Sequence, residues 1–190
     1  MHGPASPGWL LVALCGLTGA YCVLRMRSTV AEQRRSAGAE ALMGFGMAAM
    51  AVPAAVFTPP AWTWPVYAGV FGVVGLRALW AALRDAHHAH HAVGALAMVY
   101  MAVSMTVAAA QGAAGQGHAH GGGSAGLPLV TGSFLLYFTG YVLVSGSRLL
   151  PVAGVAGGPV GAVGWGDRPE LARVCRVSMG IAMVAMLMPM

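Results

Sequence analysis

Long apolar stretches alternate with short polar ones along the whole chain of 190 residues. A membrane-spanning helix needs about 20 consecutive, mostly apolar residues. Six windows meet this requirement, at residues 8–24, 38–57, 66–84, 90–110, 128–147 and 171–189. The polar stretches between them are too short to bury a core of their own. The pattern therefore predicts an all-α fold, a single polytopic transmembrane domain over residues 1–190 with about six helices.

The composition agrees with this pattern. Hydrophobic residues make up 58% of the chain and charged residues only 8%, which is too apolar for a water-soluble domain of ordinary composition. The first window has no basic segment before it and no clear small-residue cleavage site behind it. We therefore expect a helix there, and not a cleaved signal peptide.

The basic residues predict the orientation of the bundle. All ten are arginines, and they gather near the connections that follow the first, third and fifth windows: Arg25, Arg27, Arg34, Arg35, Arg77, Arg84, Arg148, Arg168, Arg173 and Arg176. Cytoplasmic loops carry an excess of basic residues, so these connections should be cytoplasmic and both termini should lie outside. The arginines are too dispersed to form a nucleic-acid patch.

Methionine marks every second window. Ten of the thirteen methionines fall in the second, fourth and sixth windows, at Met43, Met47, Met50, Met98, Met101, Met105, Met179, Met183, Met186 and Met188. In each of these windows the methionines repeat at intervals of three and four residues, so most of them share one helix face. The alternative explanation for such a stripe is core packing, because methionine commonly fills irregular gaps between helices.

Each methionine face begins with a side chain that can bind a metal ion. These are Glu40, His91 and Cys175, and all three lie near the end of the helix that is predicted to be cytoplasmic. Thioether and thiolate are soft donors that favour Cu(I), whereas oxygen-rich sets suit Mg²⁺ or Ca²⁺. An ionisable residue inside a span is costly and indicates a functional site. Alternatively, Glu40 forms a salt bridge with Arg34 or Arg35 at the interface.

Two histidine groups extend this interpretation. His87 and His91 are four residues apart and lie on the methionine face of the fourth window. His118 and His120 fall in the Gly-rich segment 111–127, which we expect to be an external loop that captures metal ions. The alternatives are a solvated helix start for the first group and a plain polar loop for the second. By contrast, Cys15 and Cys22 lie inside the first window, where cysteine usually behaves as a small buried hydrophobe.

Motifs for catalysis are largely absent. The chain has no G-x-S-x-G, no P-loop and no H-E-x-x-H sequence, so an enzyme is not favoured. Two alternatives to a copper protein remain: a b-type haem or quinone redox subunit, since His and Met are axial haem ligands, and a structural subunit of a larger membrane complex.

Three segments carry a family resemblance: "EALMGFGMAAMAVP", "HHAVGALAMVYMAVSM" and "ARVCRVSMGIAMVAMLMPM". They resemble the Met-rich helices of the DUF5134 family of actinobacterial membrane proteins. The resemblance spans most of the chain and implies a multi-pass protein of a bacterial cytoplasmic membrane. It implies no activity, so the copper hypothesis depends on the ligand chemistry alone.

The sequence therefore predicts a membrane protein with a Cu(I) site between its second, fourth and sixth helices, acting in copper transport, storage or delivery. The predicted ligands and neighbours are Glu40, Met43, Met47, His87, His91, Met98, Met101, Met105, Cys175, Met179 and Met183. Small residues should let the helices approach closely: Gly44, Gly46, Gly94 and Gly180. A copper chaperone, a cuproenzyme or a second copy of the chain would be a suitable partner.

Overall fold

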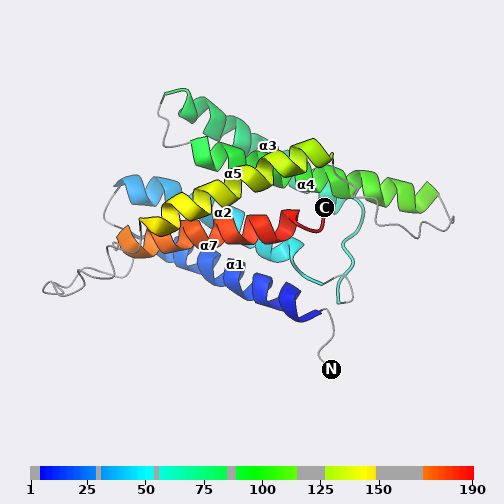
Figure 1. Ribbon diagram of the computed structural model, residues 1–190, viewed down its shortest axis with the longest axis horizontal. Helices are drawn as coiled ribbons and strands as arrows, with labels where there is room; N and C mark the ends of the chain where they lie inside the picture. The colour runs from blue at the N-terminus through cyan, green and yellow to red at the C-terminus, as the bar shows by residue number, and fades with distance from the viewer. Residues whose placement is uncertain (1–4, 29–30, 54–55, 85–88, 115–126, 149–168) are drawn as a thin grey trace, which may run out of the picture. The chain divides into compact units, whose positions relative to one another are not determined.

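The computed structural model describes residues 5–28, 31–53, 56–84, 89–114, 127–148 and 169–190. Within these ranges the chain forms helices and no strands (Figure 1): α1 (Ala5–Arg25), α2 (Ala31–Met50), α3 (Thr63–Ala82), α4 (Ala89–Ala114), α5 (Pro128–Ser147) and α7 (Pro169–Leu187). Four stretches are long and apolar enough to cross a membrane: Gly8–Arg25, Thr63–Ala82, Ala89–Ala110 and Pro128–Ser147. The predicted all-α membrane helix bundle is confirmed.

The second helix lies earlier along the chain than the apolar window 38–57 that predicted it. It begins at Ala31 and ends at Met50. Its first turns contain glutamate, glutamine and arginine, which are good helix formers although they are polar. Pro53 follows shortly after its end, and proline cannot continue a helix. The helix therefore carries charge over its first turns, and its apolar part is shorter than predicted.

The chain divides into two compact units. The first comprises residues 1–56 and 135–186, and so holds α1, α2, all of α7 but its last residue and most of α5. The second comprises residues 57–134 and 187–190, with α3, α4 and the first turns of α5. Each unit is described by itself below.

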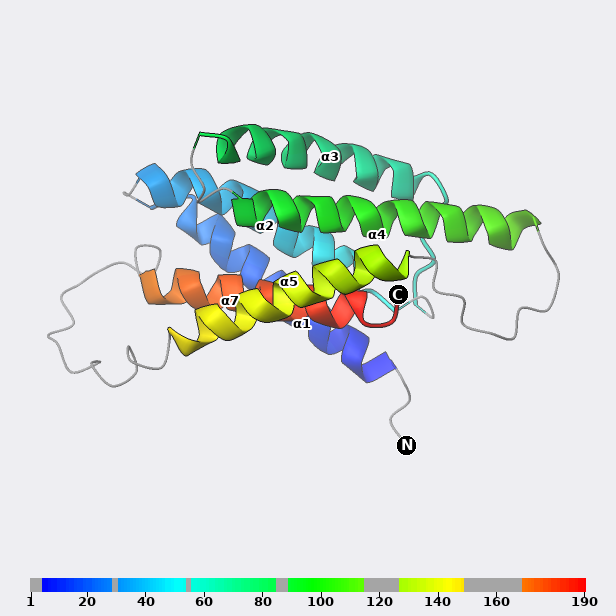
Figure 2. The same cartoon turned by 45° about the horizontal axis from the view of Figure 1, so that its top comes forward.

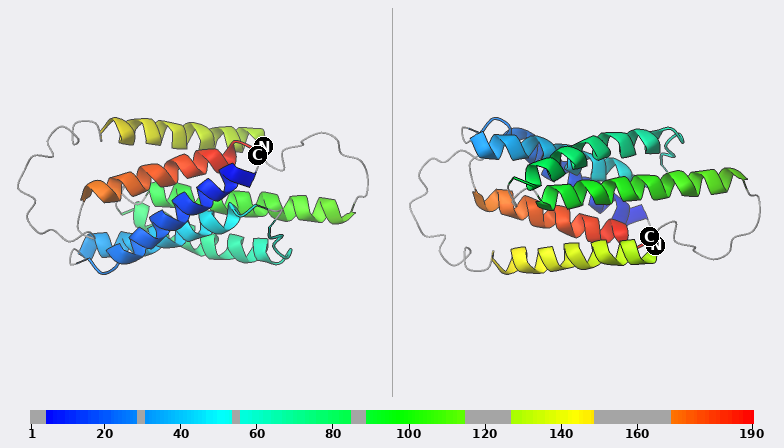
Figure 3. Two further views of the ribbon diagram at one scale, coloured as in Figure 1. Left: turned by 90° about the horizontal axis from the view of Figure 1, so that it is seen from below. Right: turned by 90° about the horizontal axis from the view of Figure 1, so that it is seen from above.

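In the first unit, glycines bring the helices close together. Helices α1 and α2 pack side by side and run in opposite directions (Figure 3). A Cβ atom on Gly44 would lie 2.9 Å from the Cα atom of Gly19, so α2 meets the backbone of α1 there. A Cβ atom on Gly180 of α7 would lie 2.8 Å from Cγ2 of Val142 on α5. The predicted role of Gly44 and Gly180 is confirmed, and Gly46 and Gly94 are both buried.

In the second unit, α3 and α4 pack side by side (Figure 2). A Cβ atom on Gly75 would lie 3.3 Å from the Cβ atom of Ala95. The hydroxyl of Tyr100 on α4 is 2.6 Å from that of Thr131 on α5. Only 11% of the α3 window is buried, so most of its apolar surface is exposed, as expected for a helix that faces lipid.

Candidate functional site: a buried ion-pair and sulfur cluster

The methionine faces are largely buried. Six of the predicted methionines are buried: Met43, Met47, Met98, Met101, Met179 and Met183. Met105, at the far end of the α4 stripe, is 40% exposed. Most of the methionine side chains therefore point inward, although burial alone is equally expected of core packing.

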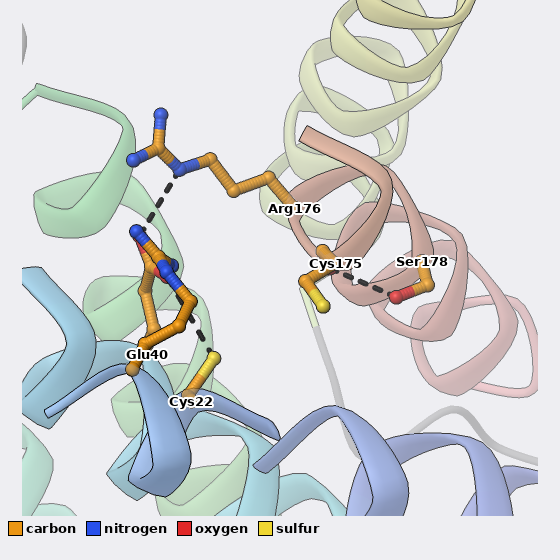
Figure 4. Close-up of polar contacts among 6 residues, drawn as sticks. Cys22, Glu40, Cys175, Arg176 and Ser178 are labelled. Atoms are coloured by element: carbon orange, nitrogen blue, oxygen red, sulfur yellow. Dashed lines mark hydrogen bonds and ion pairs between the residues drawn. The ribbon is translucent and has the colours of Figure 1, made fainter. Parts of the chain in front are cut away.

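Glu40 is fully buried and is held by arginines from two other helices. Nη1 of Arg25, at the end of α1, donates to Oε2 of Glu40 over 2.5 Å. Nε of Arg176, on α7, donates to Oε1 over 3.0 Å. The Glu40 side chain is 0% exposed and that of Arg25 is 1% exposed, whereas that of Arg176 is 30% exposed. Both carboxylate oxygens thus accept hydrogen bonds from guanidinium groups (Figure 4).

The direction of the helices explains why Arg25, Glu40 and Arg176 lie close together. Helix α1 ends, and α2 and α7 begin, at the same end of the first unit (Figure 1). Arg25 lies at the end of α1, Glu40 near the middle of α2 and Arg176 about two turns into α7, and the two arginines bond to Glu40. A buried carboxylate is strongly unfavourable unless it is paired and hydrogen-bonded. The two arginines therefore supply the ion pairs and hydrogen bonds that allow Glu40 to be buried. Glu40 in turn links α1, α2 and α7.

Two cysteines lie beside the ion pairs. Cys22 on α1 is fully buried, and its thiol contacts Oε2 of Glu40 at 3.7 Å. Cys175 on α7 is half-buried, and both thiols are free. The two thiols interact electrostatically with each other and with Arg25. Figure 4 shows both sulfur atoms turned toward the space between their helices.

One hydrogen-bond donor of Arg25 has no acceptor among the described residues. Its Nε atom is buried and has no hydrogen-bond partner within the described part of the chain. A buried donor without an acceptor costs about 1–3 kcal/mol, and more when the group is charged. The cluster thus contains an unused positive donor next to Glu40 and the two thiols.

The remaining predicted site residues are elsewhere or are not described. His91 is half-buried on α4, in the second unit, with its ring centroid 6.0 Å from that of His90. His87, His118 and His120 lie outside the described residues. Among the side chains that the structure describes, no three from His, Cys, Asp and Glu gather to hold a metal ion. The first unit brings together Glu40 and Cys175, and adds Cys22.

Sequence reasoning missed Arg25 and Cys22 as members of the cluster, and it missed the pairing of Arg176 with Glu40. It treated the arginines as markers of orientation and Cys22 as a buried hydrophobe. One local signal was available, since Cys22 and Arg25 are three residues apart and so share a face of α1. The pairing with Glu40 and Cys175 joins different helices and leaves no trace in local spacing.

These observations define a class of protein, a helical membrane bundle with a buried charged and sulfur-containing cluster among three helices. The chain belongs to the family described as "Domain of unknown function (DUF5134)", whose model matches residues 32–190. This confirms the family resemblance of the Met-rich segments. No curated protein and no solved structure matches the chain.

Proposed function

We propose that this chain is a Cu(I)-binding protein of a bacterial cytoplasmic membrane, acting in copper transport, storage or delivery. The observation that carries the proposal is the set of buried or half-buried sulfur side chains on α1, α2 and α7 of the first unit. It begins at Cys22 and Cys175 and continues along α2 and α7 as buried methionines.

The register of α2 and α7 supports a continuous row. Both helices begin at the same end of the unit (Figure 2), and Glu40 is bonded to Arg176, which fixes their relative level there. Each residue advances a helix by 1.5 Å. Met43 and Met179 therefore follow about one turn beyond this level, and Met47 and Met183 about two turns beyond it.

The chemistry of these groups favours one metal. Thiol and thioether sulfur are soft ligands, which select Cu(I) over hard ions such as Mg²⁺. Structural zinc sites use four ligands from Cys, His or carboxylate groups. Cys22, Cys175 and Glu40 lie in one cluster, but the described residues offer no three such side chains placed so that they could hold a metal ion. A sulfur-rich site with few ligands is compatible with Cu(I) more than with Zn²⁺.

The row also suggests how copper would move. Thioethers at successive turns would be weak, closely spaced sites, between which an ion can exchange. The thiols at the end of the row would bind more tightly, as expected of a receiving or storage position. The participation of His91, Met98 and Met101 stays a prediction, because α4 belongs to the other unit.

Metal analysis of the purified, detergent-solubilised protein tests the proposal. After anaerobic loading with Cu(I) and removal of unbound metal, we expect at least one copper per chain, and no Zn²⁺ after the same procedure with zinc. A protein that retains no copper would contradict the proposal. A Soret band in the purified protein would favour the haem alternative instead.

Vesicle measurements then separate transport from storage. We expect protein-dependent Cu(I) uptake into sealed proteoliposomes if the methionine row conducts the ion. Copper that stays bound to the protein, with no uptake above that of empty liposomes, would assign storage or delivery.

A further inference from the structure

Among the described side chains of the cluster that α1, α2 and α7 form, positive charges outnumber negative ones. Arg25 and Arg176 carry two positive charges and Glu40 carries one negative charge. When the thiols are protonated, these side chains sum to one positive charge. Arg25 is 1% exposed and its Nε donor has no partner among the described residues. Because a buried charged donor without an acceptor is costly, a further negative charge beside Arg25 would be favourable.

The thiols are the groups next to Arg25 that can supply this charge. Two thiolates with one monovalent cation carry a net charge of −1, which balances the three charged side chains. Two thiolates with a divalent cation are neutral and would leave the positive charge in place. The charge of the cluster therefore favours Cu(I) over Zn²⁺ independently of the softness of sulfur.

We infer that Cys22 and Cys175 are the two thiolate ligands of a Cu(I) ion, and that Glu40 is a positioning residue that holds Arg25 beside them. On binding, both S–H bonds break, two protons pass to water, and two S–Cu bonds form. Copper stays Cu(I), so no electron is transferred. This inference rests on the proposed function and assigns its tightest site.

The assignment changes the role expected of Glu40. Its two oxygens already accept hydrogen bonds from Arg25 and Arg176. Ligation by Glu40 would require it to give up one of these bonds inside a buried site. Held as it is, the carboxylate fixes the Arg25 guanidinium group next to the sulfur atoms, as outer partners do in other metal sites.

A competition titration tests the inference. The full-length protein, in detergent and under anaerobic conditions, would compete for Cu(I) with a chromogenic Cu(I) chelator. We expect Cys22→Ser and Cys175→Ser each to weaken binding by more than the roughly 10–100-fold typical of losing an outer partner. The matched control is Cys15→Ser, which replaces a cysteine that is equally buried on the same helix and should leave the affinity unchanged.

The outcomes separate the two proposals. If the wild-type protein binds no copper, the proposed function fails. If the wild type binds copper and the Cys22→Ser and Cys175→Ser variants bind it equally well, only the assignment of the site is overturned. Glu40→Gln should weaken binding by about 10–100-fold while the copper keeps its sulfur ligands. Replacement of a sulfur ligand in that variant would contradict the positioning role.

Alkylation of the wild-type protein covers the case in which a serine variant does not fold. Cys175 is only half-buried, so a small membrane-permeant alkylating reagent should reach it. Bound Cu(I) should slow its modification in proportion to the fraction of protein that holds copper, because the free thiolate is the nucleophile. An unchanged rate with copper bound would overturn the inference.

Discussion

In the first unit, buried charges join the helices beside one hydroxyl pair, Thr18 and Ser178 at 3.3 Å, whereas the polar link described in the second unit consists of neutral hydroxyl groups. Glu40 bonds to Arg25 and Arg176 and links α1, α2 and α7. Tyr100 and Thr131 link α4 and α5 through hydroxyl oxygens 2.6 Å apart. A hydroxyl pair is inexpensive to bury and contributes little, about 0.6 kcal/mol on average in membrane helices. A buried ion pair depends on both partners, so it is retained where the charge itself has a use.

Removal of Arg25 should have the largest effect on stability. Arg25→Met leaves Glu40 with one of its two described arginine partners, and breaking a buried pair costs about 3–5 kcal/mol. The free energy of unfolding, measured by titration with a denaturing detergent, should fall by about that amount. Arg27→Met replaces an exposed arginine near the same helix end and is the control.

The double variant Arg25→Met/Glu40→Met should recover part of this loss, because no unpaired carboxylate then remains. Equal stability of Arg25→Met and the wild-type protein would show that the ion pair does not hold the first unit together.

Adding a methyl group at a close helix contact should lower the free energy of unfolding more in the first unit than in the second. Gly44→Ala places a Cβ atom 2.9 Å from the backbone of Gly19, whereas Gly75→Ala places one 3.3 Å from the Cβ atom of Ala95. Overpacking costs about 1–3 kcal/mol, and we expect Gly44→Ala to fall in that range and Gly75→Ala below it. Gly16→Ala, with nothing within 4 Å, is the neutral control. A larger loss for Gly75→Ala would reverse the comparison.

The methionine row should matter for copper more than for stability. Met47→Leu and Met183→Leu conserve volume in buried positions, so each should cost less than about 1.5 kcal/mol in unfolding free energy. Each should lower the copper retained at an excess of Cu(I). Met105→Leu replaces a 40% exposed methionine and is the control. Unchanged copper content in both buried variants would assign these methionines to packing alone.

Tyr100→Phe should have the smallest effect. It removes the hydroxyl that meets Thr131, and comparable bonds in membrane helices average about 0.6 kcal/mol. The same unfolding titration should detect little change. A loss of more than about 2 kcal/mol would mean that the hydroxyl pair is as important to its unit as the ion pairs are to theirs.

Much of the fold was predictable because apolar length and period are local properties. The windows at 66–84, 90–110 and 128–147 correspond closely to α3, α4 and α5. The second window, 38–57, gave the wrong bounds for α2. Hydropathy follows apolar residues only, whereas the helix also includes polar helix formers such as those at 32–35.

The site was predictable only in part. Glu40 stands out in the sequence because a carboxylate inside an apolar window needs a partner. Its partners could not be read from spacing, because Arg25 and Arg176 lie on other helices. Cys22 looked like a core residue for the same reason. Which groups meet at a helix end depends on the three-dimensional packing of α1, α2 and α7, and that information is not local.

X-ray absorption at the copper edge shows whether Cys22 and Cys175 bind Cu(I). The full-length wild-type protein would be loaded anaerobically with one equivalent of Cu(I). We expect the absorption edge of Cu(I) and a first coordination shell of the copper that contains only sulfur, from Cys22 and Cys175. A first shell with oxygen or nitrogen neighbours, as expected from ligation by Glu40 or His91, would contradict this expectation.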